Sequence, residues 1–100
     1  MAKKDTYNII ITGVGGQGLI TLLQVIGQAA LQEGYDVKTS ELHGLSQRGG
    51  SVSVHIRFGR QIFSPIIAQG QADLVLALEM QEALAGAEFA SKKTAFLVNQ

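Results

Sequence analysis

The sequence has no cysteine, no tryptophan and a single proline among its 100 residues. Without cysteine, the chain itself forms no disulfide, no thiolate zinc site and no cysteine-ligated iron–sulfur cluster. No apolar run approaches the roughly 20 residues that a membrane-spanning helix needs. A secretory signal contains an apolar run near the start of the chain, and no such run precedes Asn8. These absences lead us to expect a soluble, cytoplasmic protein.

Charged residues are also scarce, at 16% of the chain against 46% hydrophobic residues. Eight basic and eight acidic side chains give a formal net charge of zero. A balanced charge provides no electrostatic footprint for nucleic acid or for an anionic membrane. Disordered chains have the opposite composition. The composition therefore predicts a folded domain, part of whose surface is covered by a partner protein.

The first part of the sequence follows the order strand, glycine cluster, helix, strand. Residues 7–12 are mostly β-branched and predict a buried strand, and residues 19–33 have apolar positions at helical spacing. Gly34 is placed to end this helix. Gly27 lies inside it at a cost of about 1 kcal/mol relative to alanine, so we expect close packing on the sheet there. With residues 35–39 as a second strand, the pattern predicts a right-handed βαβ unit.

The second part predicts further strands and one more helix. Residues 52–58 alternate between apolar and polar, and with a turn at 59–60 and residues 61–63 they predict a β-hairpin. His55 falls on the polar face of that strand and receives no role. The run at 74–78 is typical of a strand buried on both faces, and Asp73 is expected to turn the chain into it. A helix over 79–90 and a strand over 95–98 follow.

These elements predict an α/β fold, a three-layer Rossmann-like domain with a mostly parallel sheet and one inserted β-hairpin. A doubly wound fold normally has a helix after each strand. We therefore expect residues 1–100 to form a single domain that is the N-terminal part of a longer, truncated chain.

The glycine cluster between the first strand and the helix matches the G-x-G-x-x-G pattern. Such glycines permit a tight turn, close approach of a phosphate and close helix packing, and the helix start offers N–H groups to an anion. Glu41 stands about where a ribose-binding acid is expected. In the alternative interpretation the glycines serve only a tight connection against another subunit. The candidate cofactor-binding residues are Gly13, Gly15, Gly16, Gln17 and Gly18.

A second motif occupies residues 41–51, which interrupt the regular pattern and are expected to form a functional loop. Its glycines allow positive φ and close approach of a partner. Arg48 offers a planar fork of donors to a carboxylate or phosphate. The alternative is a structural loop in which Arg48 pairs with Glu41 and His43 is solvated. The polar and glycine candidates are Glu41, His43, Ser46, Gln47, Arg48, Gly49 and Gly50.

Taken together, the two motifs resemble the gamma-type subunits of 2-oxoacid:ferredoxin oxidoreductases. The His-Gly-x-Ser-Gln-Arg-Gly-Gly form at 43–50 is similar to that of the indolepyruvate branch. Ser64-Pro65 and Ala72-Asp73 fit the same family pattern. The resemblance extends from about Tyr7 to the end of the chain.

The resemblance implies a supporting role in an enzyme complex. In that family, thiamine diphosphate attacks the 2-oxo carbon, iron–sulfur clusters pass electrons to ferredoxin, and coenzyme A takes the acyl group as co-substrate. This chain lacks cysteine and a Gly-Asp-Gly thiamine motif. Thiamine diphosphate, magnesium and the clusters are therefore expected on a larger partner subunit, and no catalytic or metal-ligating residue is assigned here.

The resemblance also implies roles for individual residues. Arg48 is expected to anchor the loop, with Gly49 and Gly50 allowing close approach. Glu41, His43, Ser46 and Gln47 are expected at the subunit interface or along the cofactor channel. Two alternatives remain open: a stand-alone NAD- or FAD-binding Rossmann protein, and a non-catalytic interaction module or non-functional fragment.

Overall fold

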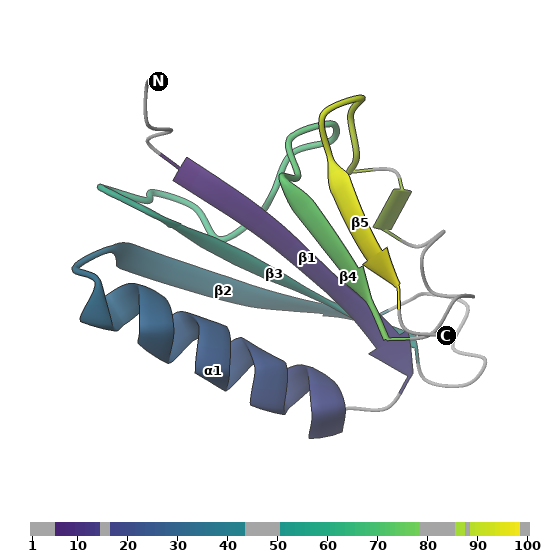
Figure 1. Cartoon of the computed structure of the whole chain (residues 1–100), viewed down its shortest axis with the longest axis horizontal. Coiled ribbons are helices and arrows are strands. Elements are labelled where there is room, and N and C mark those ends of the chain that lie inside the picture. The colour runs from purple at the N-terminus through teal and green to yellow at the C-terminus, as the bar shows by residue number, and fades with distance from the viewer. Residues whose placement is uncertain (1–5, 15–16, 44–50, 79–85, 88, 99–100) are drawn as a thin grey trace.

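The computed structural model describes residues 6–14, 17–43, 51–78, 86–87 and 89–98. Five strands form one sheet in the order β2-β3-β1-β4-β5 (Figure 1). The helix α1 spans Gln17–Gln32. The strands are β1 (Thr6–Val14), β2 (Asp36–His43), β3 (Ser51–Gly59), β4 (Leu74–Ala77) and β5 (Ala95–Val98).

The sheet is mixed, and most of its strands run in the same direction. β1 pairs parallel with β4, and β4 pairs parallel with β5. β3 is antiparallel to both of its neighbours, β1 and β2. Four strands therefore point the same way, and β3 is inserted against them. The α/β class with an inserted antiparallel element is confirmed, whereas β1 and β2 are separated by β3 and are not the adjacent pair of a simple βαβ unit.

The position of the hairpin was predicted wrongly. β3 pairs along its length with β2, from Asp36 opposite Gly59 to His43 opposite Val52. Residues 61–63 form no strand. Instead, the Ile62 N–H donates to the Asp36 carboxylate at 2.8 Å, which turns the chain away after β3. Alternation identifies a half-covered strand, but it does not identify the neighbour with which that strand pairs.

Both faces of the sheet are covered, which gives the three layers. On one face α1 packs against β1, β2 and β3, and Leu19 joins a core with Ile11 and Val54. On the other face Ile10 and Val75 pack with Ile67, Ala72 and Phe89. Gly86 and Ala87 are helical, but most of the helix expected over 79–90 lies outside the described residues. Among the residues that the structure describes, no helical segment has the length and apolar character needed to cross a bilayer.

His55 belongs to the core, contrary to expectation. Its side chain is fully buried on the face away from α1. Its Nδ1 accepts a hydrogen bond from the Ile67 N–H at 3.1 Å, and its ring packs edge-on against Phe89 with centroids 4.8 Å apart. An alternating strand has a polar face, but later residues cover that face here. His55 therefore fastens this covering segment to β3.

Polar contacts also fix the amino-terminal end of β1. Asn8 and Asp73 are joined twice: the Asn8 N–H donates to Asp73 Oδ2 at 2.8 Å, and the Asp73 N–H donates to the Asn8 carbonyl at 2.8 Å. Arg57 Nε donates to Asn8 Oδ1 at 2.9 Å. Asp73 thus ties the start of β4 to β1, in agreement with its expected turning role.

Three glycines, Gly34, Gly27 and Gly86, differ in backbone conformation and in the space around them. Gly34 has φ of 88°, which suits the left-handed end of a helix, and it ends α1 as expected. A Cβ at Gly27 would meet no atom within 4 Å, so the expected close packing there is wrong. Close approach occurs at Gly86, where a Cβ would lie 2.6 Å from Val75 Cγ1.

Alanine at Gly27 and alanine at Gly86 should change the free energy of unfolding in opposite directions. Gly27→Ala should stabilise the fold by about 0.5–1 kcal/mol, because alanine has the better helix propensity and space is open. Gly86→Ala should destabilise it by about 1–3 kcal/mol, because the new methyl overlaps Val75. Urea unfolding of both variants measures this. Equal effects of the two substitutions would contradict the packing described.

The Asp36 carboxylate should make stability depend on pH. The hydrogen bond from the Ile62 N–H, and secondarily Lys38, lowers the pKa of Asp36 below its usual value. The stabilisation is therefore complete above about pH 4, the unfolded pKa, and is lost as pH falls through the lower folded pKa. The difference in unfolding free energy between wild type and Asp36→Asn should shrink from pH 7 to pH 3. Lys38→Met should retain most of the pH dependence, and a pH-independent difference would contradict this account.

Candidate functional site

The described parts of both sequence motifs meet at one edge of the sheet. Gly13 of β1 lies opposite Val52 of β3, and Val52 lies opposite His43 of β2. The next row on the other side runs from Thr12 through Ala77 to Val98. The parallel strands therefore end together, where β3 begins. Ligands of open α/β sheets bind outside the carboxyl ends of the strands, which makes this carboxyl edge the candidate site.

The connection from β1 to α1, residues 13–18, is called the glycine turn, and Leu78 packs closely against its two ends. β1 ends at Val14 and α1 begins at Gln17. A Cβ at Gly13 would lie 3.3 Å from Leu78 Cδ1, and one at Gly18 would lie 3.4 Å from the same atom. The Leu78 N–H also donates to the Thr12 carbonyl at 2.9 Å. The first and third glycines therefore admit Leu78 to the strand–helix junction, while Gly15 and Gly16 lie outside the described residues.

The start of α1 is suited to an anion. Its first turn contains no acidic residue, and the whole segment Gln17–Gln32 carries no charged side chain. Gly18 is exposed. The N–H groups of a first helical turn have no partner within the helix and carry a partial positive charge. With Leu78 on one side of the junction, an anionic group would approach from the solvent side of Gly18.

Part of the second motif is strand, not loop. Glu41 and His43 belong to β2, an outer strand of the sheet, so the expected loop position of both is wrong. Glu41 is exposed, and its register partner is Val54. The sequence could not show this because a polar stretch at a sheet edge needs no apolar alternation. Outside the described residues lie Ser46, Gln47, Arg48, Gly49 and Gly50.

The inserted β3 separates Glu41 from the glycine turn. Glu41, Val54 and Ile11 share one row of the sheet, two residues before the row that contains Gly13. Strands are spaced about 4.8 Å apart, so β2 lies about 10 Å from β1. In a dinucleotide site the ribose-binding acid is carried by a strand adjacent to β1. This arrangement disfavours the ribose-binding role proposed for Glu41.

An apolar cavity of about 440 Å³ adjoins the same edge. Leu78 links it to the glycine turn, and its lining is Leu22, Leu76, Ala77, Leu78, Leu97 and Val98. The sequence identified these residues only as core positions, because apolar runs do not reveal which side chains border open space. In the described part of the chain, no three His, Cys, Asp or Glu side chains are grouped to hold a metal ion. The edge therefore offers backbone donors and apolar surface.

Comparison with known proteins finds relatives for nearly the whole chain. Residues 8–100 match the family described as pyruvate ferredoxin/flavodoxin oxidoreductase. Two similar curated proteins are named indolepyruvate oxidoreductase subunit IorB. The one from Thermococcus kodakarensis is 50% identical over 78 residues, covering 78% of this chain and 39% of the relative. The one from Archaeoglobus fulgidus is 48% identical over 92 residues, covering 92% and 45%. The chain thus spans less than half the length of these relatives.

A solved structure shares the fold. It is the gamma subunit of a keto/oxoacid ferredoxin oxidoreductase from Geobacter sulfurreducens, 27% identical, with a TM-score of 0.71. The match covers 92% of this chain and 50% of that one. The α/β architecture with its mixed sheet is therefore one already observed in a protein of this description.

Proposed function

The chain belongs to the pyruvate ferredoxin/flavodoxin oxidoreductase family, and from this premise we propose that it forms part of the small, gamma-type subunit of a 2-oxoacid:ferredoxin oxidoreductase. The observation that carries the proposal is the convergence of the glycine turn and the end of β2 at one carboxyl edge. The two IorB relatives support indolepyruvate or another arylpyruvate as the substrate of the complex. Residues 1–100 would be a single domain, the N-terminal part of the gamma-type domain, acting in the cytoplasm.

The proposed division of labour rests on the family to which the chain belongs and on its lack of cysteine. The chain contains no cysteine, so iron–sulfur clusters would be held by a larger partner subunit, together with thiamine diphosphate and magnesium. That subunit would carry out the oxidative decarboxylation and reduce ferredoxin. This chain would complete the assembly without being catalytic alone.

The glycine turn suits the anionic part of a co-substrate. The residues that would hold such a group are Gly15, Gly16, Gln17 and Gly18. Of these, Gln17 and Gly18 open α1 and would offer the backbone N–H groups of a helix start. Coenzyme A carries phosphates and accepts the acyl group in the proposed reaction, so its phosphates are the proposed occupant. Gly13 would contribute by admitting Leu78, which supports the turn from the sheet side.

The segment that follows β2 would face the partner subunit. Arg48 is the proposed anchor, with Gly49 and Gly50 allowing close approach. Ser46 and Gln47 would add polar contacts from the same segment, and Glu41 and His43 would add them from the end of β2. A guanidinium that binds a carboxylate or phosphate across an interface is a frequent centre of binding energy.

The function is tested by recovering the natural gene product from its own cells. A tagged chain should bring down a thiamine- and cluster-bearing subunit. The recovered material should reduce a viologen dye in a reaction that needs indolepyruvate, thiamine diphosphate and coenzyme A. Arg48→Ala should lower recovery of that subunit about tenfold or more while circular dichroism stays unchanged. Lys92→Ala, an exposed cation elsewhere, is the matched control.

Two outcomes would contradict the proposal. Recovery of the chain alone with bound NAD or FAD would favour the stand-alone Rossmann alternative. Equal recovery and activity with Arg48→Ala and wild type would remove Arg48 from the interface.

A further inference from the structure

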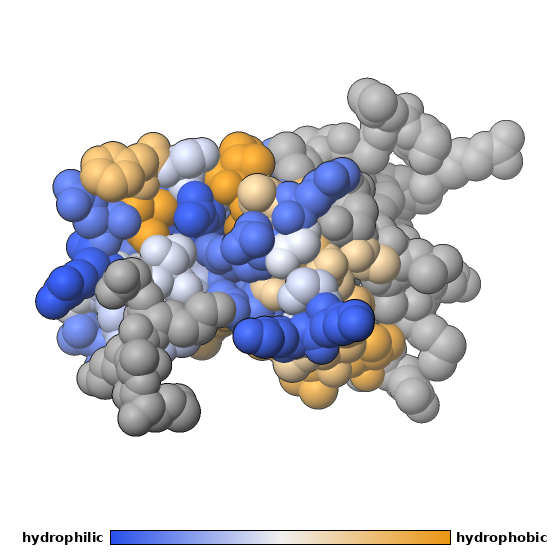
Figure 2. Space-filling model, turned by 90° about the horizontal axis from the view of Figure 1, so that it is seen from above, coloured by the Kyte–Doolittle hydropathy of each residue, from blue (hydrophilic) through white to orange (hydrophobic). Residues whose placement is uncertain are grey.

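The segment after β3 presents exposed apolar side chains between two buried ones. Ile62 and Ile67 are 4% and 1% exposed and anchor the segment to the sheet. Between them, Phe63 is 85% exposed and Ile66 is 46% exposed. We call residues 62–67 the apolar ridge. It lies on the face of the sheet away from α1, where Figure 2 shows hydrophobic side chains at the margins of a largely hydrophilic surface.

Hydrogen bonds hold the ridge in place at both ends. The Ile62 N–H donates to Asp36 Oδ2 at 2.8 Å, and the Ile67 N–H donates to His55 Nδ1 at 3.1 Å. In between, Arg57 Nη1 donates to the Ser64 carbonyl at 2.9 Å. Phe63 is therefore held in solvent by a fixed backbone. An exposed aromatic on a preorganised segment loses little conformational entropy on binding and is a typical anchor of an interface.

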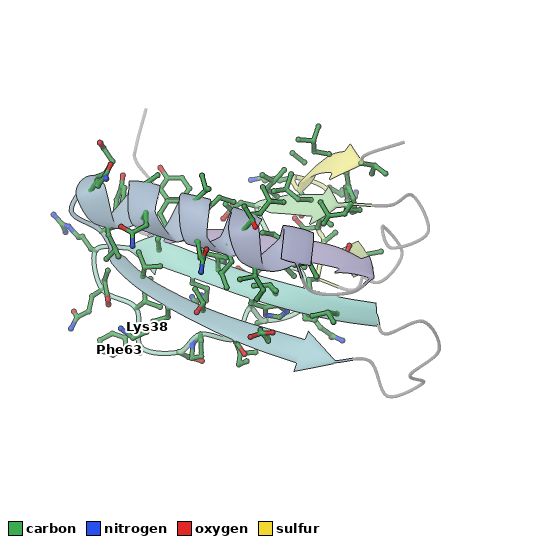
Figure 3. All side chains as sticks on the ribbon, turned by 90° about the horizontal axis from the view of Figure 1, so that it is seen from below. Lys38 and Phe63 are labelled. Atoms are coloured by element: carbon green, nitrogen blue, oxygen red, sulfur yellow. The ribbon has the colours of Figure 1, made fainter. Side chains whose placement is uncertain are left out.

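The surroundings of the ridge are basic. Lys38 of β2 lies beside Phe63 in Figure 3, and the Ile62–Asp36 and Asp36–Lys38 bonds join their two segments. Arg57 and Arg60 add two further cations, and Arg60 is exposed. The acidic residue beside them, Asp36, already uses one oxygen on Lys38 and the other on Ile62. Asp36 offsets one of the three cations Lys38, Arg57 and Arg60, so these four side chains leave a net positive charge beside the exposed apolar ones.

We infer that the apolar ridge docks into an apolar pocket with an acidic rim on the larger partner subunit. This inference rests on the proposed function for the identity of the partner, and on the ridge itself for the chemistry of the pocket. Complementary charge steers association and fixes orientation. A second copy docking the same surface would bring like charges together, since a two-fold interface joins identical patches.

The ridge is separate from the carboxyl edge. It contacts Asp36, the first residue of β2, and follows Gly59, the last residue of β3. Glu41 and His43 lie toward the other end of β2. Loss of the ridge should therefore weaken assembly without altering the glycine turn. The partner would hold this domain at two places, which fixes the carboxyl edge relative to the active site of the complex.

The test measures binding of the full chain to the large subunit purified from the same cells. Phe63→Ser should weaken binding at least tenfold, and its melting temperature should match wild type because Phe63 is 85% exposed. Phe96→Ser, an exposed phenylalanine on β5, is the matched control and should leave affinity within twofold. Arg60→Glu should weaken binding and reduce its dependence on salt.

Each contrary result has a distinct meaning. If Phe63→Ser binds the large subunit as tightly as the wild-type chain does, the apolar ridge is not a docking surface, and the proposed function is unaffected. Absence of binding by the wild-type chain would overturn the proposed function and the partner named here. Self-association of the wild-type chain that Phe63→Ser abolishes would overturn the partner in favour of a second copy. Binding of wild type to anionic vesicles that Phe63→Ser abolishes would overturn it in favour of a membrane surface.

Discussion

The fold depends on the burial of both faces of β1. Ile11 faces α1 and Ile10 faces the opposite layer, and neither is accessible to solvent. β1 also has a neighbour on each side: it pairs with β3 over its whole length and with β4 over Ile9–Thr12. A strand enclosed in this way requires apolar residues on both faces, which is why residues 7–12 are so easily recognised. Its enclosure fixes the position of the glycine turn that follows directly.

From this constraint the site follows. Because β1 is fixed, α1 must start at the carboxyl edge, and the small size of Gly13 and Gly18 lets Leu78 close the junction. Because β3 lies between β1 and β2, the end of β2 is brought to the same edge from the other side. The two motifs are far apart in sequence but are joined through one row of backbone pairs. The ridge is a second consequence, since the chain leaving β3 must cross the face that α1 does not cover.

The sequence predicted where helices and strands lie better than it predicted which strands pair and which side chains are covered. The strand over 7–12, the helix over 19–33 and the end of that helix at Gly34 are confirmed, because local periodicity and a positive φ determine them. The pairing of β3 with β2 was missed, because strand order depends on contacts between distant segments. Burial of His55 was missed for the same reason, since its cover comes from Ile67 and Phe89. In the site, Gly13 and Gly18 were identified from the sequence, but the supporting role of Leu78 was not.

The central claim, that the end of β2 lies beside the start of β3 and so at the glycine turn, is tested most directly by disulfide trapping. The chain has no cysteine of its own, so two introduced cysteines report without interference. Leu42 and Ser53 are register partners, and paired strand residues have Cα atoms about 4.5–5.5 Å apart, within disulfide reach. Leu42→Cys/Ser53→Cys should form an intramolecular disulfide on mild oxidation. Ser40→Cys/Ser53→Cys, a diagonal pair, should not. A bridge in the diagonal pair but not in the register pair would contradict the alignment of β2 with β3, and a bridge in neither pair would contradict their pairing, on which the position of the end of β2 at the glycine turn depends.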